Sequence, residues 1–268
     1  KIIHTHPTTR RIRQMAQTAA ADFHVRLAET PEDYHAAQRL RYDVFVRELG
    51  GGGAMVDHDA GLERDRFDPF VDHLLLIDSA RDAVVGVYRL MRAEMAAKAG
   101  GYYSEAEYDL TRLKSSGRRL LELGRSCLLA PYRGGVGMHH LWSGLARYVA
   151  QHRIEVLFGV ASFHGTDVAS VAAPLSLLHQ RHLAPDPLRV RALEQSFQNM
   201  DLIDKAHLDR RAAMVQMPSL IKAYLRLGGC VGEGAYIDHD FNTVDVCLIM
   251  DTAQLNDRQA RIYGAQDI

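Results

Sequence analysis

The sequence predicts a single domain of mixed α/β architecture, in which one sheet is flanked by helices. Apolar runs of strand length alternate with amphipathic segments of helical period along most of the 268 residues. We find no internal repeat and no low-complexity linker that would divide the chain. A composition of 47% hydrophobic and 24% charged residues is ordinary for a chain that buries a substantial core. We therefore expect residues 23–268 to form one domain.

The N-terminal half contains a strand, a helix and a hairpin. The stretch "FHVRLAE" at 23–29 predicts a strand, and Thr30, Pro31 and Asp33 are typical of the start of a helix that ends at the glycines from Gly50. Two apolar runs, 72–78 and 83–91, are separated by turn residues and predict a hairpin. Residues 100–110 are expected to form a loop.

The C-terminal half alternates strands and helices. We expect a strand within residues 119–130, a helix up to residue 152, and a buried strand at 154–163. Residues 165–198 predict a helix followed by an irregular excursion. The last elements are a helix at 217–229, stopped by glycines, and two strands within 235–251.

Composition excludes several classes of protein. A net charge of −1 excludes a nucleic-acid binder that works by a bulk positive field. Three scattered cysteines are too few for a disulfide framework or a zinc site and indicate a reducing cytosol, so we predict a cytoplasmic protein. No apolar run approaches the roughly 18 residues of a membrane span. Residues 1–22 hold three arginines but no apolar block, so we expect a flexible or peripheral arm rather than a secretory signal.

Charged residues interrupt strongly apolar patterns at four places. They are Arg41 in the first helix, the loop "ERDRFD" at 63–68, Arg89 in the second hairpin strand, and the pair Glu122 and Arg125. Burying an unpaired charge costs several kcal/mol, so such residues pair with each other or with a ligand. The pattern alone leaves two interpretations open, a functional cleft and a structural ion-pair network.

The strand that contains Glu122 and Arg125 carries a second signal. Residues three apart in a regular strand point to opposite faces, so both side chains share one cleft only if the strand bulges. Gly124 lies between them, and an isolated glycine in a strand is typical of a bulge. A bulge leaves a backbone N–H free to bind the oxygen of a reacting acyl group.

A glycine-rich turn follows this strand and begins a helix. Backbone N–H groups at such a helix start bind phosphate, as they would in the stretch "CLLAPYRGGVGMHH" at 127–140. A bulged strand with an internal Glu followed by a phosphate turn indicates transfer of an acyl group from a phosphopantetheine thioester.

These residues resemble the GNAT-like acyltransferases that use acyl-carrier-protein thioesters. "LRYDVF", "ERDRFD", "GVYRL" and "LELGR" occur in the order found in autoinducer synthases. From about Phe23 to Gly264 the chain is more similar to the ornithine N-acyltransferases of ornithine-lipid synthesis, through stretches such as "GGYYSEAEYDL", "LFGVASFHGTD" and "GAYIDHDFNTVDV". The resemblance implies a mixed, mostly antiparallel GNAT-like sheet that a C-terminal helix and hairpin complete.

Two departures narrow the expected chemistry. The CoA-binding signature of acetyltransferases is Arg, two residues, Gly, one residue, then Gly or Ala. Counted from Arg133, it requires glycine where Val136 stands. Only a shifted register, with Gly135 and Gly137 as its glycines, resembles the signature. Autoinducer synthases carry a tryptophan before their acidic loop, whereas the single tryptophan here is Trp142, in a later helix. We therefore expect neither simple acetyl-CoA use nor a homoserine-lactone product.

The resemblance also implies roles for individual residues. The α-amine of ornithine would attack a 3-hydroxyacyl thioester on acyl carrier protein, with Glu122 as the base. One of Arg41, Arg89 and Arg125 would bind the amino acid's carboxylate, because the guanidinium fork suits it. Asp65 and Asp68 would either receive the distal ammonium or orient those arginines. The thioester and its phosphopantetheine arm would contact Cys127, Leu128, Arg133, Gly135 and Gly137.

The expected partners follow from the donor. Acyl carrier protein is acidic, so we expect a basic landing patch, with Arg118, Arg119, Arg210 and Arg211 as candidates that could equally be ordinary surface residues. The acyl-phosphopantetheine of the carrier is the donor, and no permanently bound cofactor is expected. A lipid-like product makes transient contact with the inner membrane plausible.

Several alternatives stay open at this point. A different amino acid, such as glutamine or lysine, an acetyl-CoA-dependent reaction on a small amine, or a non-catalytic binding relative would fit parts of the pattern. We expect Cys127 to be a small buried hydrophobe rather than a nucleophile. We expect no metal at the two "DHD" triplets, 57–59 and 238–240, since adjacent residues rarely converge on one ion.

Overall fold

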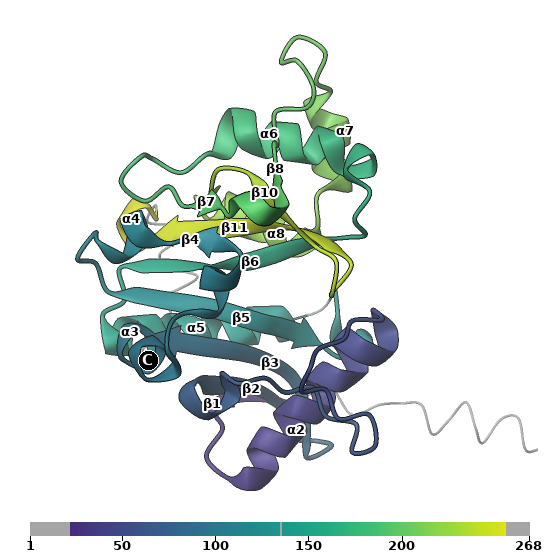
Figure 1. The fold of residues 1–268 in the computed structure, drawn as a ribbon. Helices are drawn as coiled ribbons and strands as arrows, with labels where there is room; N and C mark the ends of the chain where they lie inside the picture. The colour runs from purple at the N-terminus through teal and green to yellow at the C-terminus, as the bar shows by residue number, and fades with distance from the viewer. Residues whose placement is uncertain (1–21, 135, 256–268) are drawn as a thin grey trace, which may run out of the picture.

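The computed structural model describes residues 22–134 and 136–255. Apart from Asp22, the predicted N-terminal arm lies outside the described residues. A single nine-stranded sheet runs through the molecule in the order β1-β2-β3-β5-β6-β11-β10-β8, with β9 paired to β11 (Figure 1). The pair β5 and β6 is parallel, and the other strand pairs of this sheet in the described ranges are antiparallel. The predicted sheet class is therefore confirmed.

The predicted strands and helices occur in the predicted order, together with shorter elements that were not predicted, some of them within the expected loop at 100–110 and the expected irregular excursion. The strands of the main sheet are β1 Phe23–Leu27, β2 Asp72–Asp78, β3 Ala83–Arg92, β5 Leu120–Leu128, β6 Val156–His164, β8 Phe197–Gln198, β9 Cys230–Val231, β10 Ala235–Asp238 and β11 Thr243–Asp251. A separate ribbon pairs β4 Tyr108–Asp109 with β7 Arg191–Ala192. The helices are α2 Pro31–Arg41, α3 Ala93–Ala99, α4 Thr111–Lys114, α5 Gly137–His152, α6 Ala172–His182, α7 Arg210–Gln216 and α8 Ser219–Arg226. None of these helices combines the length and the apolar composition required to cross a bilayer.

The first helix begins where its sequence indicates. Thr30 and Asp33 form a reciprocal capping box, and Pro31 occupies the first turn. The helix does not end at Arg41 but widens into a π-helical segment, Tyr42–Glu48, which ends before Gly50. Such widened turns are frequent at functional sites.

Helices α2 and α5 cover opposite faces of the sheet. Alternation along β2 explains this arrangement, because Leu74 and Leu76 pack with the residues of α5, whereas Leu75 and Ile77 pack with those of α2. Figure 1 shows α2 crossing in front of β2 and β3, while α5 lies behind the sheet. The α2 face also carries the acidic loop before β2, and this is the face on which the charged residues gather.

The sheet opens between its two parallel strands. Strands β5 and β6 pair only from Leu120 to Glu122, opposite Val156–Phe158, and they have no further paired residues beyond that point. Gly159 permits a close approach to β5 next to the last pair, since a Cβ there would lie 2.1 Å from the carbonyl oxygen of Leu123. On its other edge β6 pairs with β11 along its whole length. The predicted C-terminal hairpin thus completes the sheet beside the opening.

Candidate active site

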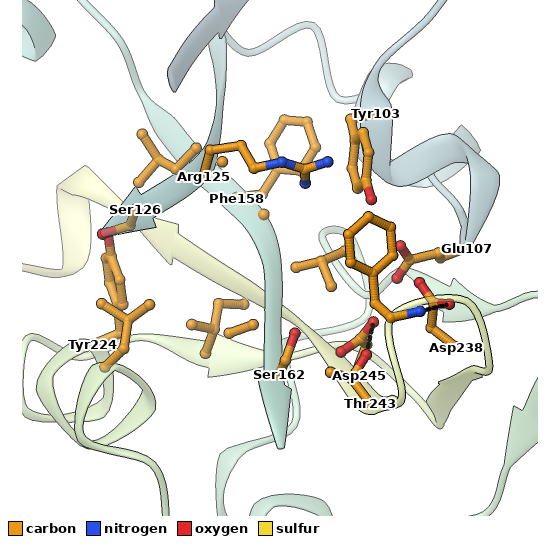
Figure 2. Close-up of a pocket in the computed structure, with 18 of the residues that line it drawn as sticks. Tyr103, Glu107, Arg125, Ser126, Phe158, Ser162, Tyr224, Asp238, Thr243 and Asp245 are labelled. Carbon is orange, nitrogen blue, oxygen red and sulfur yellow. Dashed lines mark hydrogen bonds between the residues drawn. The ribbon is translucent and has the colours of Figure 1, made fainter. Parts of the chain in front are cut away.

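A cavity of about 300 Å³ lies where β5 and β6 diverge (Figure 2). Its walls are largely apolar, with contributions from Leu123, Leu157, Phe158, Val160, Leu220 and Leu248. Polar side chains gather toward one end, where Tyr103, Glu107, Arg125, Asp238 and Asp245 meet, and Ser126 and Tyr224 lie toward the other. A cavity with apolar walls and a few convergent polar groups is typical of a ligand site.

The strand bulge predicted near Gly124 is present. Arg89 of β3 lies opposite Gly124 and Val87 lies opposite Cys127, so Arg125 and Ser126 together occupy the place of one residue. Arg125 itself carries the positive φ of 50°, which a non-glycine residue rarely adopts.

The bulge changes the face on which Arg125 lies. Glu122 accepts hydrogen bonds from the Tyr103–Ala106 turn, and the guanidinium of Arg125 lies 4.8 Å from the centre of the Tyr103 ring. Both charged side chains therefore lie on the same face of the sheet, as the sequence reasoning required.

Arg41 is the centre of a buried network of charges. Its Nε donates to Glu63 Oε2 at 2.5 Å, and its two terminal nitrogens donate to both carboxylate oxygens of Asp68 at 2.9 and 2.7 Å. Nη2 also donates to the carbonyl oxygen of Glu63 at 2.6 Å. With its side chain fully buried, Arg41 has no face left for a substrate.

Arg89 and Arg125 complete the network. Arg89 Nη1 lies 2.6 Å from Asp65 Oδ2 and 3.2 Å from Asp68 Oδ1. Arg125 Nε lies 3.1 Å from Glu63 Oε1, and its Nη2 lies 3.4 Å from Asp65 Oδ2. Three arginines thus alternate with three carboxylates, and each charge has a partner of opposite sign.

The predicted cluster therefore comes together, but most of it lies outside the cavity. The contacts of Asp65 and Asp68 match the interpretation that these residues orient arginines. Of the three arginines, Arg125 lines the cavity, and Arg41 and Arg89 do not. Sequence reasoning missed Glu63, the first residue of the quoted loop "ERDRFD". Its position two residues before Asp65 was the available signal, because residues with that spacing in an extended loop can reach the same partner.

Glu122 is held by the backbone. Its two carboxylate oxygens accept hydrogen bonds from the N–H groups of Tyr103 at 2.9 Å and Ser104 at 2.7 Å. Burial raises the pKa of Glu122, although these hydrogen bonds oppose the shift. The residue is 4% exposed and does not line the cavity. Its geometry therefore fits a residue that holds the Tyr103–Ala106 turn in place, and not a base, which would need to face the cavity.

Three carboxylates at the polar end of the cavity were not identified from the sequence. Glu107 precedes β4, Asp238 ends β10, and Asp245 lies on β11, and one oxygen of each falls within 4.8 Å of the others. Burial and the charges of its two neighbours raise the pKa of Glu107 to about 9. Burial, aided by the charge of Asp238, raises the pKa of Asp245 to about 7.

The second "DHD" triplet contributes Asp238 alone to this carboxylate group in the described chain. The sequence did not reveal the cluster, because Glu107 is remote in the chain from Asp238 and Asp245. Only the β10–β11 hairpin and the return of the chain at β4 bring them together.

The predicted thioester contacts surround the end of β5. The Cys127 side chain packs in the apolar layer under α2, and burial raises the pKa of its thiol. Leu128 packs on the opposite face, and its carbonyl oxygen accepts from Arg133 Nε at 2.9 Å. Arg133 also pairs with Glu48.

Helix α5 then begins at the buried Gly137, and no side chain caps its first turn. The predicted Gly135 lies outside the described residues. The Arg133 side chain is engaged by Glu48 and by the carbonyl oxygen of Leu128, and the phosphopantetheine contact at this turn stays a prediction.

The four predicted landing-patch arginines lie in two separate elements. Arg118 and Arg119 precede β5 and contact Glu155, and Arg118 also forms an ion pair with Asp251. Arg210 and Arg211 are exposed in the first turn of α7. The first pair is therefore largely neutralised by neighbouring carboxylates.

Comparison with known proteins supports the predicted GNAT-like fold. The model of the acetyltransferase (GNAT) domain matches residues 40–143. The fold is similar to that of FeeM, an N-acyl amino acid synthase from uncultured soil microbes, with a TM-score of 0.50 at 11% identity over 88% of this chain and 93% of that one. It is also similar to the CoA-dependent acyl-homoserine lactone synthase BjaI, with a TM-score of 0.51 at 13% identity over 91% of this chain and 88% of that one.

Sequence comparison identifies much nearer relatives. An L-ornithine N(alpha)-acyltransferase of Rhodobacter capsulatus is 56% identical over 250 residues, which is 91% of this chain and 96% of the relative. A second, of Brucella abortus, is 44% identical over 90% of this chain and 89% of the relative. Identity at this level over nearly the whole length shows that the chain is an acyltransferase and belongs to the family of L-ornithine N(alpha)-acyltransferases.

Proposed function

We propose that the protein transfers a 3-hydroxy fatty acyl group from acyl carrier protein to the α-amine of L-ornithine, forming lyso-ornithine lipid. The observation that carries this proposal is the cavity beside the β5 bulge, which joins apolar walls to a polar end that includes Arg125. The names of the relatives support ornithine as the acceptor.

The bulge would activate the thioester. Arg125 and Ser126 have no paired residue in β3 or β6, so a backbone N–H of this segment is available to the thioester carbonyl. A donor aimed at the developing oxyanion stabilises the tetrahedral intermediate and is commonly worth a hundredfold or more in rate, roughly 3 kcal/mol. The backbone of Cys127 and Leu128 and the turn from Arg133 to Gly137 would hold the phosphopantetheine arm.

The acyl chain would lie along the apolar wall. Each methylene that it buries contributes about 0.8 kcal/mol, so a long chain gains more from this wall than an acetyl group does. We propose on this basis that a long-chain donor is preferred to acetyl-CoA.

The amino acid would enter at the polar end. Arg125 is held by Glu63 and Asp65 and stacks near Tyr103 and Phe241, which fixes its guanidinium at the cavity wall as a receptor for the α-carboxylate. In this proposal Glu122 acts as a positioning residue, because it fixes the turn that carries Tyr103.

The reaction then needs a free α-amine. The α-ammonium loses a proton to water at the open end of the cavity, where Ser162 and His164 are exposed. The amine nitrogen attacks the carbonyl carbon, an N–C bond forms, and the C–S bond breaks. The thiol of the carrier leaves with a proton, and the other product is an amide.

One assay tests the proposal. Purified protein is incubated with 3-hydroxyacyl carrier-protein thioesters and L-ornithine, and the amide is identified by mass spectrometry. We expect product with wild type, loss of at least about 100-fold in kcat/KM for Arg125→Ala, and wild-type behaviour for Arg47→Ala, whose guanidinium is largely exposed. No acylated ornithine with any long-chain donor, or turnover with acetyl-CoA alone, would contradict the proposal.

We also propose that the enzyme works in the cytoplasm and contacts the inner membrane only to release its product. The product combines one acyl chain with a charged head group, and a single chain gives marginal, reversible membrane binding. Sedimentation with anionic lipid vesicles should therefore recover more protein when product is being formed than without substrates.

A further inference from the structure

We infer that Glu107, Asp238 and Asp245 form the binding site for the distal ammonium of the amino-acid substrate and so determine the preference for a diamino acid. This inference rests on the proposed function, which supplies the substrate class. It differs from one of the two roles that the sequence left open for Asp65 and Asp68, which was to receive this ammonium.

The three carboxylates lie in the wall of the cavity and are incompletely satisfied. Glu107 is 5% exposed and Asp245 is 3% exposed, yet Glu107 Oε2 and Asp245 Oδ1 are buried without a hydrogen-bond partner among residues 22–134 and 136–255. Figure 2 shows the three side chains converging at one end of the cavity. Buried polar oxygens normally have partners, so these oxygens indicate a missing donor.

Fixed contacts hold the remaining oxygens in place. Asp238 Oδ1 accepts from the backbone N–H groups of Asp240 at 2.8 Å and Phe241 at 3.0 Å. Asp245 Oδ2 accepts from the Thr243 hydroxyl at 3.1 Å. Asp238 and Asp245 are therefore preorganised by the β10–β11 hairpin, and the buried Glu107 joins them from the segment before β4.

The charge balance of the cluster also calls for a cation. Within the described part of the chain, none of the three carboxylates forms an ion pair with Lys or Arg, and the nearby Arg125 is already bonded to Glu63 and Asp65. The pKa values of Glu107 and Asp245 are raised because burial and mutual repulsion disfavour their charged forms. A bound cation would remove this penalty.

An ammonium group fits this site well. It offers three N–H donors, and the cluster offers three carboxylates, two from the β10–β11 hairpin and one from the segment before β4. Arg125 lines the same cavity, and its Nη1 takes no part in the bonds that its Nε and Nη2 make with Glu63 and Asp65, so this nitrogen can take a carboxylate. A molecule with a carboxylate at one end and an ammonium at the other can then satisfy both sites. A neutral side chain would leave the buried carboxylates without a partner, which strongly disfavours binding.

The test compares L-ornithine with L-2-aminopentanoate, which has the same carbon chain but lacks the distal amine. Binding to the full chain is measured by isothermal titration calorimetry, and kcat/KM is measured with the acyl-carrier thioester. Wild type should prefer ornithine by about 100-fold or more in both measurements. In Glu107→Gln and Asp245→Asn the preference should fall at least about tenfold, while the values for 2-aminopentanoate stay within about threefold.

The exposed Asp240 in the same hairpin provides a matched control, and Asp240→Asn should keep the wild-type preference. Equal binding of the two amino acids by wild type would overturn the inference, as would equal losses for both in the variants. Binding of Mn²⁺ or Ca²⁺ that is lost in Glu107→Gln, without selectivity for ornithine, would also overturn it in favour of a metal site. Selective binding of ornithine without acylation would sustain the inference and reject the proposed function.

Discussion

Replacing Arg41 with methionine removes the centre of the buried network while keeping a side chain of similar length. The substitution leaves Asp68 without its bidentate partner and Glu63 without its closest hydrogen bond. Breaking a buried pair by removing one partner typically costs 3–5 kcal/mol, because the remaining charge stays buried. Arg89 and Arg125 still contact the two carboxylates, so we expect the lower end of this range, about 3 kcal/mol.

Urea unfolding followed by circular dichroism measures this loss. We expect a lower midpoint at an unchanged m-value, and a fall in Tm of about 6–12 °C for a chain of this size. Arg47→Met is the control, since its ion pair with Asp43 is exposed and should be worth less than about 0.5 kcal/mol. A loss below about 1 kcal/mol for Arg41→Met would refute the reasoning, because it would show that the network behaves like a surface ion pair.

The pH dependence gives an independent check on the same variant. Burial opposes ionisation of Asp68, but Arg41 outweighs it and keeps the pKa at about 2. The lowered pKa adds stability that is present above the ordinary aspartate pKa and is lost as the pH falls through about 2. Without Arg41 the buried carboxylate should have a raised pKa, so the deficit of Arg41→Met should be largest near pH 7 and shrink as the pH falls toward about 4.

Three further predictions concern the cavity and its surroundings. The pKa of Glu107 is raised to about 9 in the fold, so the folded state binds more protons and its stability should fall as the pH rises from about 4 to 9. In Glu107→Gln this pH dependence should flatten, and the free energy of unfolding measured in urea should rise by on the order of 3 kcal/mol at pH 7. Glu122→Gln replaces one acceptor of the Tyr103–Ser104 turn by a donor, so kcat/KM should fall while the shape of its pH profile is unchanged; a lost limb of that profile would instead identify Glu122 as the base. Cys127→Ala should keep kcat within about threefold in the thioester assay, whereas abolished turnover would indicate an acyl-enzyme.

Elements whose signals are local could be predicted from the sequence. The helix start at Thr30, the hairpin of β2 and β3 and the bulge beside Gly124 each depend on residues close together in the chain. The charged cluster was also predictable as a set, because a buried charge needs a partner of opposite sign and the four charged stretches could supply partners for one another.

The sequence by itself therefore determined the long strands of the sheet, most of the longer helices, the bulge and the membership of most of the charged network. Only the tertiary structure decided which charges are already paired and which face the cavity. Arg41 and Asp68 satisfy each other away from it, whereas Glu107 and Asp245, 138 positions apart in the chain, share one buried corner without a cation. The physical reason is distance, because periodicity describes which face a residue occupies, but the energy of a charge depends on atoms a few ångströms away that the fold brings from remote segments.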